Sequence, residues 1–109
     1  METQRKIIRD GYAEKSGLPG FRIESTTDHA QLEDLLELKK IEELNELTDA
    51  ISSGDKTAIM EEAADAIEAI LARATLHGVT PQEVEIQRIK KREALGGFEK
   101  GLILVTEEN

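Results

Sequence analysis

The sequence predicts an all-α fold, in which three main helices form a bundle that is completed by oligomerisation. Apolar side chains recur every three or four residues over two long stretches, residues 32–51 and 59–74, as they do on the buried face of a helix. Each stretch follows a helix-capping residue and stops at a glycine. A chain of 109 residues has the size of one domain, so we assign residues 1–109 to a single domain. A domain this short buries only part of its surface, which favours association with further copies.

The first helix is expected over residues 30–52. Asp28 precedes it as an N-cap, and Gln31 follows three residues later, which is the arrangement of a capping box. Gly54 marks its end, because glycine readily ends a helix.

The second helix is expected to begin after Asp55 and to end at Gly78. Its predicted core face is rich in alanine, and small side chains let a neighbouring helix approach closely. The third helix starts at Thr80-Pro81-Gln82-Glu83, where a capping threonine, a proline at the first helical position and a glutamate at the third combine. It is expected to reach Leu95 and to end at Gly96-Gly97.

The two ends of the chain have a different pattern. Residues 21–25 alternate between apolar and polar, and residues 101–106 form a short apolar run rich in residues that favour strands. The sequence therefore predicts that these two segments pair into a short two-stranded ribbon beside the three helices. Two strands alone have only marginal stability without helical support.

The composition of the chain excludes several kinds of partner and of metal site. The net charge is -9, which disfavours non-specific binding to nucleic acid or to an anionic membrane. The chain has no cysteine, which excludes disulfides and thiolate metal sites, and no apolar run long enough to span a bilayer. We expect a cytoplasmic protein with no nucleic-acid or membrane partner.

Two acidic clusters contain candidate metal ligands: Glu42, Glu43 and Glu46 in the first helix, and Glu61, Glu62 and Asp65 in the second. The pairs at the i,i+3 spacing are Glu43 with Glu46 and Glu62 with Asp65. The pairs at the i,i+4 spacing are Glu42 with Glu46 and Glu61 with Asp65. Both spacings place two carboxylates on one helix face, so spacing alone does not choose between the two sets. Two such helices side by side would form a cage of four carboxylates, and hard cations such as Mg²⁺ prefer oxygen ligands.

Other polar residues are expected to be structural. His29 lies at the start of a helix and His77 at the end of one, and neither has a companion metal ligand nearby in the sequence. Glu33 lies outside the acidic clusters and is expected to be an ordinary exposed charge.

The pattern Glu42-Glu43-x-x-Glu46 followed by Glu62-x-x-Asp65 resembles the metal-binding signature of the all-α nucleotide pyrophosphohydrolases. That group contains the MazG-like enzymes and the phosphoribosyl-ATP pyrophosphohydrolases. Three further stretches are similar to one branch of it, in the same order: Lys6–Asp10 to K-L-V-R-D, Ala64–Glu68 to A-D-V-L-E, and Lys91–Phe98 to K-R-x-x-R-G-G-F. The chain departs from the branch at Gly11-Tyr12-Ala13, where K-I-P is usual, and at Leu95, where an arginine often stands.

The resemblance implies hydrolysis of a nucleoside triphosphate, or a related nucleotide, between its α and β phosphates in nucleotide-pool house-cleaning. One alternative is phosphoribosyl-ATP hydrolysis in histidine synthesis; another is a non-catalytic helical module for oligomerisation or partner binding. Carried over to this chain, the resemblance implies a homodimer or higher homo-oligomer and Mg²⁺, or Mn²⁺, as the cofactor.

The site residues implied by the resemblance form three groups. The metal ligands are Glu43, Glu46, Glu62 and Asp65. The catalytic carboxylates are Glu42 and Glu43, with Glu42 on the edge of the face holding a further metal or accepting a proton from the attacking water. The candidate phosphate contacts are Arg9, Lys39, Lys91 and Arg92.

Overall fold

Four α-helices make up the regular structure of the protein, which is described from a computed structural model covering residues 4–15, 20 and 22–107. The helices are α1 (Asp10–Lys15), α2 (His29–Ser53), α3 (Lys56–Leu76) and α4 (Pro81–Leu95). The all-α prediction with three main helices is confirmed. The short helix α1 was not expected from the sequence.

The predicted helix ends are confirmed by their capping contacts. The Asp28 side chain accepts a hydrogen bond from the backbone nitrogen of Gln31 at 3.1 Å, and Gly54 ends α2 in the left-handed conformation with φ 72°. Asp55 caps α3 in the same way as Asp28 caps α2. Thr80 and Glu83 form the reciprocal pair of bonds of a capping box at the start of α4.

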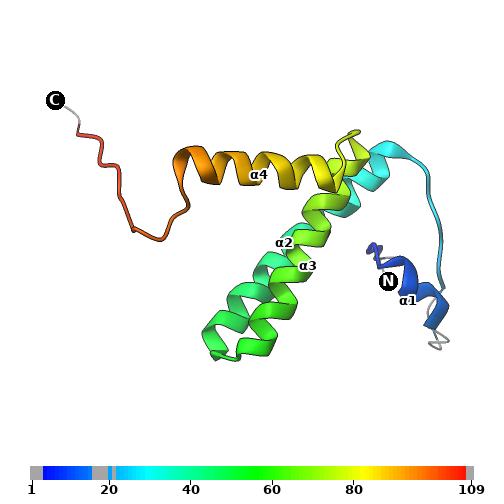
Figure 1. The fold of residues 1–109 in the computed structure, drawn as a ribbon. Coiled ribbons are helices and arrows are strands. Elements are labelled where there is room, and N and C mark those ends of the chain that lie inside the picture. Colours follow the sequence, from blue (N-terminus) through cyan, green and yellow to red (C-terminus); the bar gives the residue numbers. More distant parts are fainter. Residues whose placement is uncertain (1–3, 16–19, 21, 108–109) are drawn as a thin grey trace.

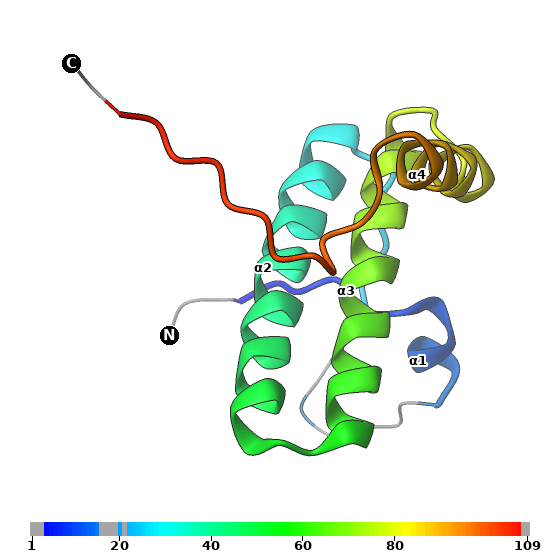
Figure 2. The ribbon, with the colours of Figure 1, turned by 60° about the vertical axis from the view of Figure 1, so that its left-hand side comes forward.

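Helices α2 and α3 pack side by side as an antiparallel hairpin (Figures 1 and 2). The buried apolar residues of the described chain are Leu36, Ala50, Ala66 and Ala69. Three of these four are alanines, so the two helix backbones approach closely, as the alanine-rich face of the second helix predicted. Helix α4 contacts the C-terminal part of α3 and then leads away from the hairpin (Figure 1).

A group of charged side chains joins α2 to α3 toward the start of α2. Arg73 Nε donates a hydrogen bond to Glu33 Oε1 at 2.7 Å, and the same guanidinium pairs with Glu37. His77 Nε2 lies 2.6 Å from Glu33 Oε2, and the ring of His29 packs edge-on against that of His77. The structural role expected for both histidines is confirmed. The expectation that Glu33 is an ordinary exposed charge is wrong, because α3 places Arg73 and His77 against it and both hold its pKa below the usual value.

The predicted ribbon is wrong for the residues that the structure describes. Residues 22–25 and 101–106 contain no strand, while Phe21 lies outside the described residues. In Figures 1 and 2 the C-terminal segment runs away from the helices, so the two segments are too far apart for the ladder of hydrogen bonds that a ribbon requires.

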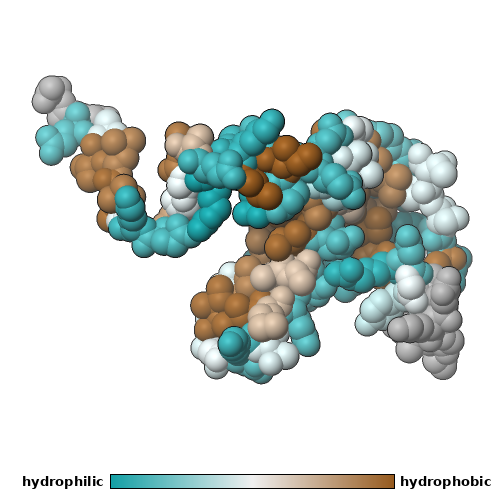
Figure 3. All heavy atoms as spheres, viewed as in Figure 1, coloured by the Kyte–Doolittle hydropathy of each residue, from teal (hydrophilic) through white to brown (hydrophobic). Residues whose placement is uncertain are grey.

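Much apolar surface stays exposed to solvent (Figure 3). Phe98 and residues 102–105 are at least 71% exposed, and isoleucines on α3 and α4 are about half exposed. No described helix is both long and apolar enough to cross a membrane.

Candidate metal and phosphate site

The carboxylates of α2 and α3 meet across the hairpin in two overlapping groups. Oxygens of Glu42, Glu43 and Glu46 lie within 4.8 Å of one another, and so do oxygens of Glu43, Glu62 and Asp65. Glu43 belongs to both groups and therefore joins the ligands of α2 to those of α3. We call these five residues the carboxylate cluster. All four carboxylates assigned as metal ligands from the sequence belong to it, and so does Glu42.

Glu43 is the buried member of the carboxylate cluster. It is 3% exposed and is the one buried charged residue in the described part of the chain. Its Oε2 atom and that of Glu62 are both buried, and neither accepts a hydrogen bond from any residue that the structure describes. Buried carboxylate oxygens normally have a partner. Two such oxygens facing one cluster fit a hard divalent cation, whose preferred ligands are carboxylate oxygens.

Lys39 supplies a cation from within α2. Its Nζ lies 2.9 Å from Glu43 Oε1 and 3.8 Å from Glu42 Oε1. Partial burial opposes the charged form of Lys39, but the hydrogen bond to Glu43 and the fields of the nearby carboxylates outweigh it and raise the lysine pKa. Lys39 therefore stays protonated beside the carboxylate cluster.

Glu62 shows how crowded the acidic groups are. Its pKa is raised to about 7, mainly because its carboxyl group lies against that of Glu46, with further contributions from desolvation and from Glu43. A carboxyl group with this pKa is largely protonated in mildly acidic solution. The crowded carboxyl groups thus disfavour one another's ionised forms, as is expected where a cation is to be bound.

The segment before α1 carries two further cations to the carboxylate cluster. Lys6 Nζ lies 2.8 Å from Glu42 Oε1, and Arg9 Nη2 lies 2.6 Å from Asp65 Oδ1. The bond to Asp65 raises the Arg9 pKa, and the charges of Glu68 and Glu43 add to this effect. The structure therefore brings Arg9, a predicted phosphate contact, to the cluster. Lys6 was not singled out from the sequence, although it opens the K-L-V-R-D-like stretch.

The structure does not bring the other predicted phosphate contacts to the carboxylate cluster. Lys91 and Arg92 lie on α4, which leads away from the hairpin (Figure 1), and Arg92 pairs with Glu99 at 2.6 Å. Among the described residues, neither of them forms an ion pair with the cluster. Glu61, a member of the i,i+4 alternative, is exposed and belongs to neither group of carboxylates.

Comparison with known families identifies the fold that carries this cluster. A family model described as phosphoribosyl-ATP pyrophosphohydrolase matches residues 22–93, which is more than half of the chain and includes α2, α3 and both acidic pairs. The chain belongs to the phosphoribosyl-ATP pyrophosphohydrolase family. This family is part of the all-α nucleoside triphosphate pyrophosphohydrolase superfamily that the sequence resembled, so the resemblance is confirmed.

Membership makes the protein an enzyme, a pyrophosphohydrolase that acts on a nucleotide. Searches of curated proteins and of solved structures found no match. The matched residues leave out Lys6 and Arg9, so the contacts of the N-terminal segment with the carboxylate cluster come from the structure alone.

Proposed function

We propose that this protein hydrolyses phosphoribosyl-ATP between its α and β phosphates, releasing pyrophosphate. The family description supports this substrate better than it supports a nucleoside triphosphate hydrolysed in nucleotide-pool house-cleaning, which was the first expectation from the sequence. The observation that carries the chemistry is Glu43, a buried carboxylate shared by two acidic groups, with one oxygen that no described residue satisfies.

We assign Glu43, Glu46, Glu62 and Asp65 as the ligands of Mg²⁺, with Mn²⁺ as a substitute. The ion, when bound, neutralises charge on the phosphates and favours attack by water. The ligands come from both helices of one hairpin, so the close packing of α2 on α3 fixes their separation. Glu43 is held by Lys39, which orients its carboxylate and leaves its second oxygen free.

Glu42 is the proposed acceptor of the proton from the attacking water. It lies on the edge of the carboxylate cluster and is about one-third exposed, which gives water access to it. Its pKa is lowered, first by Lys6 and then by Lys39, so it is ionised at neutral pH and able to accept a proton. Arg9 and Lys39 lie beside the cluster, where they can contact the phosphates of a bound nucleotide.

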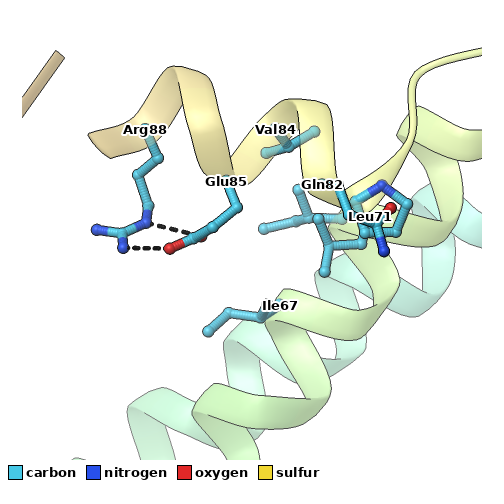
Figure 4. A pocket seen from close by; sticks show the side chains of 8 residues that line it. Ile67, Leu71, Gln82, Val84, Glu85 and Arg88 are labelled. Atoms are coloured by element: carbon cyan, nitrogen blue, oxygen red, sulfur yellow. Dashed lines mark hydrogen bonds and ion pairs between the residues drawn. The ribbon is translucent and has the colours of Figure 1, made fainter. Parts of the chain in front are cut away.

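We also propose that the protein functions as at least a homodimer. Ile67 and Leu71 of α3 and Val84 of α4 line an apolar groove that is open to solvent, beside the Glu85–Arg88 ion pair (Figure 4). A second copy that covers this groove and the exposed isoleucines would remove apolar surface from water. Helix α4 directs Lys91 and Arg92 away from the carboxylate cluster of their own chain. In a dimer, these two residues would instead be available to phosphates bound at the cluster of the other copy.

The direct test of the activity measures pyrophosphate release with Mg²⁺ or Mn²⁺ from a panel of substrates: phosphoribosyl-ATP, the standard nucleoside triphosphates and modified triphosphates. We expect the highest kcat/KM with phosphoribosyl-ATP. A higher value with a modified triphosphate would support house-cleaning instead. No pyrophosphate from any substrate would leave the non-catalytic module as the better account.

Assembly is tested by sedimentation at about 10 to 50 μM protein, where a stable interface should be fully formed. A single species of 12.1 kDa would contradict the dimer. Co-expression of Asp65→Asn and Arg92→Gln chains tests the sharing of residues between copies. If each chain alone is inactive, mixed oligomers should regain part of the activity only if Arg92 acts on the partner's cluster.

A further inference from the structure

We propose that Lys6 and Arg9 have two alternating sets of partners: the carboxylate cluster before the divalent cation binds, and the phosphates of the nucleotide afterwards. Lys6 thereby becomes a substrate-binding residue that the family match does not include. The inference rests on the proposed function, since it requires a cation and a nucleotide at the cluster.

Lys6 and Arg9 are three residues apart in one extended segment, yet one binds a carboxylate of α2 and the other a carboxylate of α3. The segment therefore bridges the carboxylates of α2 and those of α3. We call residues 6–9 the basic strap. It places two cations against the carboxylates that, in the proposed function, surround the divalent cation.

Arg9 and a divalent cation would compete for the carboxylate of Asp65. Arg9 binds Oδ1 of Asp65, and a carboxylate oxygen of Asp65 also lies within 4.8 Å of oxygens of Glu43 and Glu62. A cation that takes Asp65 as a ligand withdraws negative charge from Arg9, so the attraction between the two side chains weakens. Glu43 and Glu62 each retain a buried oxygen that has no hydrogen-bond partner among the described residues, so the strap and Lys39 leave these oxygens unsatisfied.

The basic strap is weakly held by its ion pairs, and its side chains are well suited to binding phosphate. The side chains of Lys6 and Arg9 are 58% and 52% exposed, and exposed ion pairs contribute little to stability. Exchanging one anion for another therefore has a small cost. Guanidinium and ammonium groups are the usual partners of phosphate oxygens in proteins.

The test compares two binding constants by calorimetry: that for Mn²⁺ alone, and that for α,β-methylene-ATP in saturating Mn²⁺. Arg9→Gln removes the competitor for Asp65, so it should bind Mn²⁺ alone about two- to fivefold more tightly. The same variant should bind the analogue about 10- to 100-fold more weakly, because a charged hydrogen bond to phosphate is lost. Lys6→Gln should change both constants in the same directions, and Arg9→Lys should recover part of the analogue binding.

The matched control is Arg5→Gln. Arg5 precedes the strap and pairs with Glu24 at 3.2 Å, away from the cluster, so both constants should stay at the wild-type values. A purely structural strap would lower both affinities together in Arg9→Gln, and that result would overturn the proposal, as would two unchanged constants. If wild type itself binds no Mn²⁺, the proposed function fails with it. If wild type binds Mn²⁺ and releases pyrophosphate while the variants match it, only the strap fails.

Discussion

Replacing Ala66 by leucine tests whether the close packing of α2 on α3 creates the metal site. Ala66 is 4% exposed, lies in the interface between the two helices and directly follows Asp65. A larger side chain there must either distort the core or push the helices apart. Overpacking of this kind costs about 1 to 3 kcal/mol. For a domain of this size the melting temperature should fall by about 5 to 20 °C.

The effect on the metal follows from the ligand separation. The oxygens of Glu43, Glu62 and Asp65 lie within 4.8 Å of one another. Ligands on opposite sides of Mg²⁺ are about 4.2 Å apart, since each metal–oxygen distance is about 2.1 Å. Interaxial distances between helices vary by about 1 to 2 Å with the side chains at the contact. An increase of this size would move oxygens of α2 and α3 too far apart to bind the same ion. Mn²⁺ affinity should fall about tenfold or more.

The assay is calorimetric titration with Mn²⁺ at a temperature at which the variant is fully folded, together with a thermal melt without metal. Ala64→Leu is the matched control, because Ala64 is exposed on the same helix two residues away. It should match wild type in both measurements. An Ala66→Leu protein that melts and binds Mn²⁺ as wild type does, or a control that is equally impaired, would refute the argument.

Three further variants test other parts of the structure. Asp65→Asn should lower pyrophosphate release by about 100-fold or more, while the exposed control Asp34→Asn should not change it; equal rates for the two would rule out the carboxylate mechanism. The pKa of Glu62 is raised from 4.5 to about 7, so its protonated form stabilises the metal-free fold fully below pH 4.5, and this stabilisation is lost as the pH rises through about 7. The melting temperature of the metal-free protein should therefore fall between about pH 5.5 and 8, and it should fall less in Glu62→Gln. Mn²⁺ should raise the melting temperature more at pH 8 than at about pH 5.5, and a Mn²⁺ effect independent of pH would contradict this. Arg73→Gln should lower the melting temperature, because it removes the cation that pairs with Glu33 and Glu37 across the hairpin, and a melt identical to wild type would show that these pairs contribute nothing.

Local features of the sequence were sufficient to predict the three main helices. A cap such as Asp28 bonds to a backbone nitrogen three residues away, and the apolar period of a helix is set by its own geometry. For the same reason the spacing of Glu43 with Glu46 and of Glu62 with Asp65 correctly placed each pair on one helix face. The motifs also indicated the family, and the match over residues 22–93 confirms that family.

Only the tertiary structure decided which charges meet. The packing of α2 on α3 makes Glu43 the shared and buried carboxylate, pairs Glu33 with Arg73, and brings Arg9 to Asp65 across 56 residues. Helix α4 leads the C-terminal segment away from the hairpin, so the two segments that had the composition of strands do not meet (Figure 1). Such contacts depend on the relative placement of segments distant in the chain. That placement is set by the burial of side chains between helices, and no local spacing encodes it.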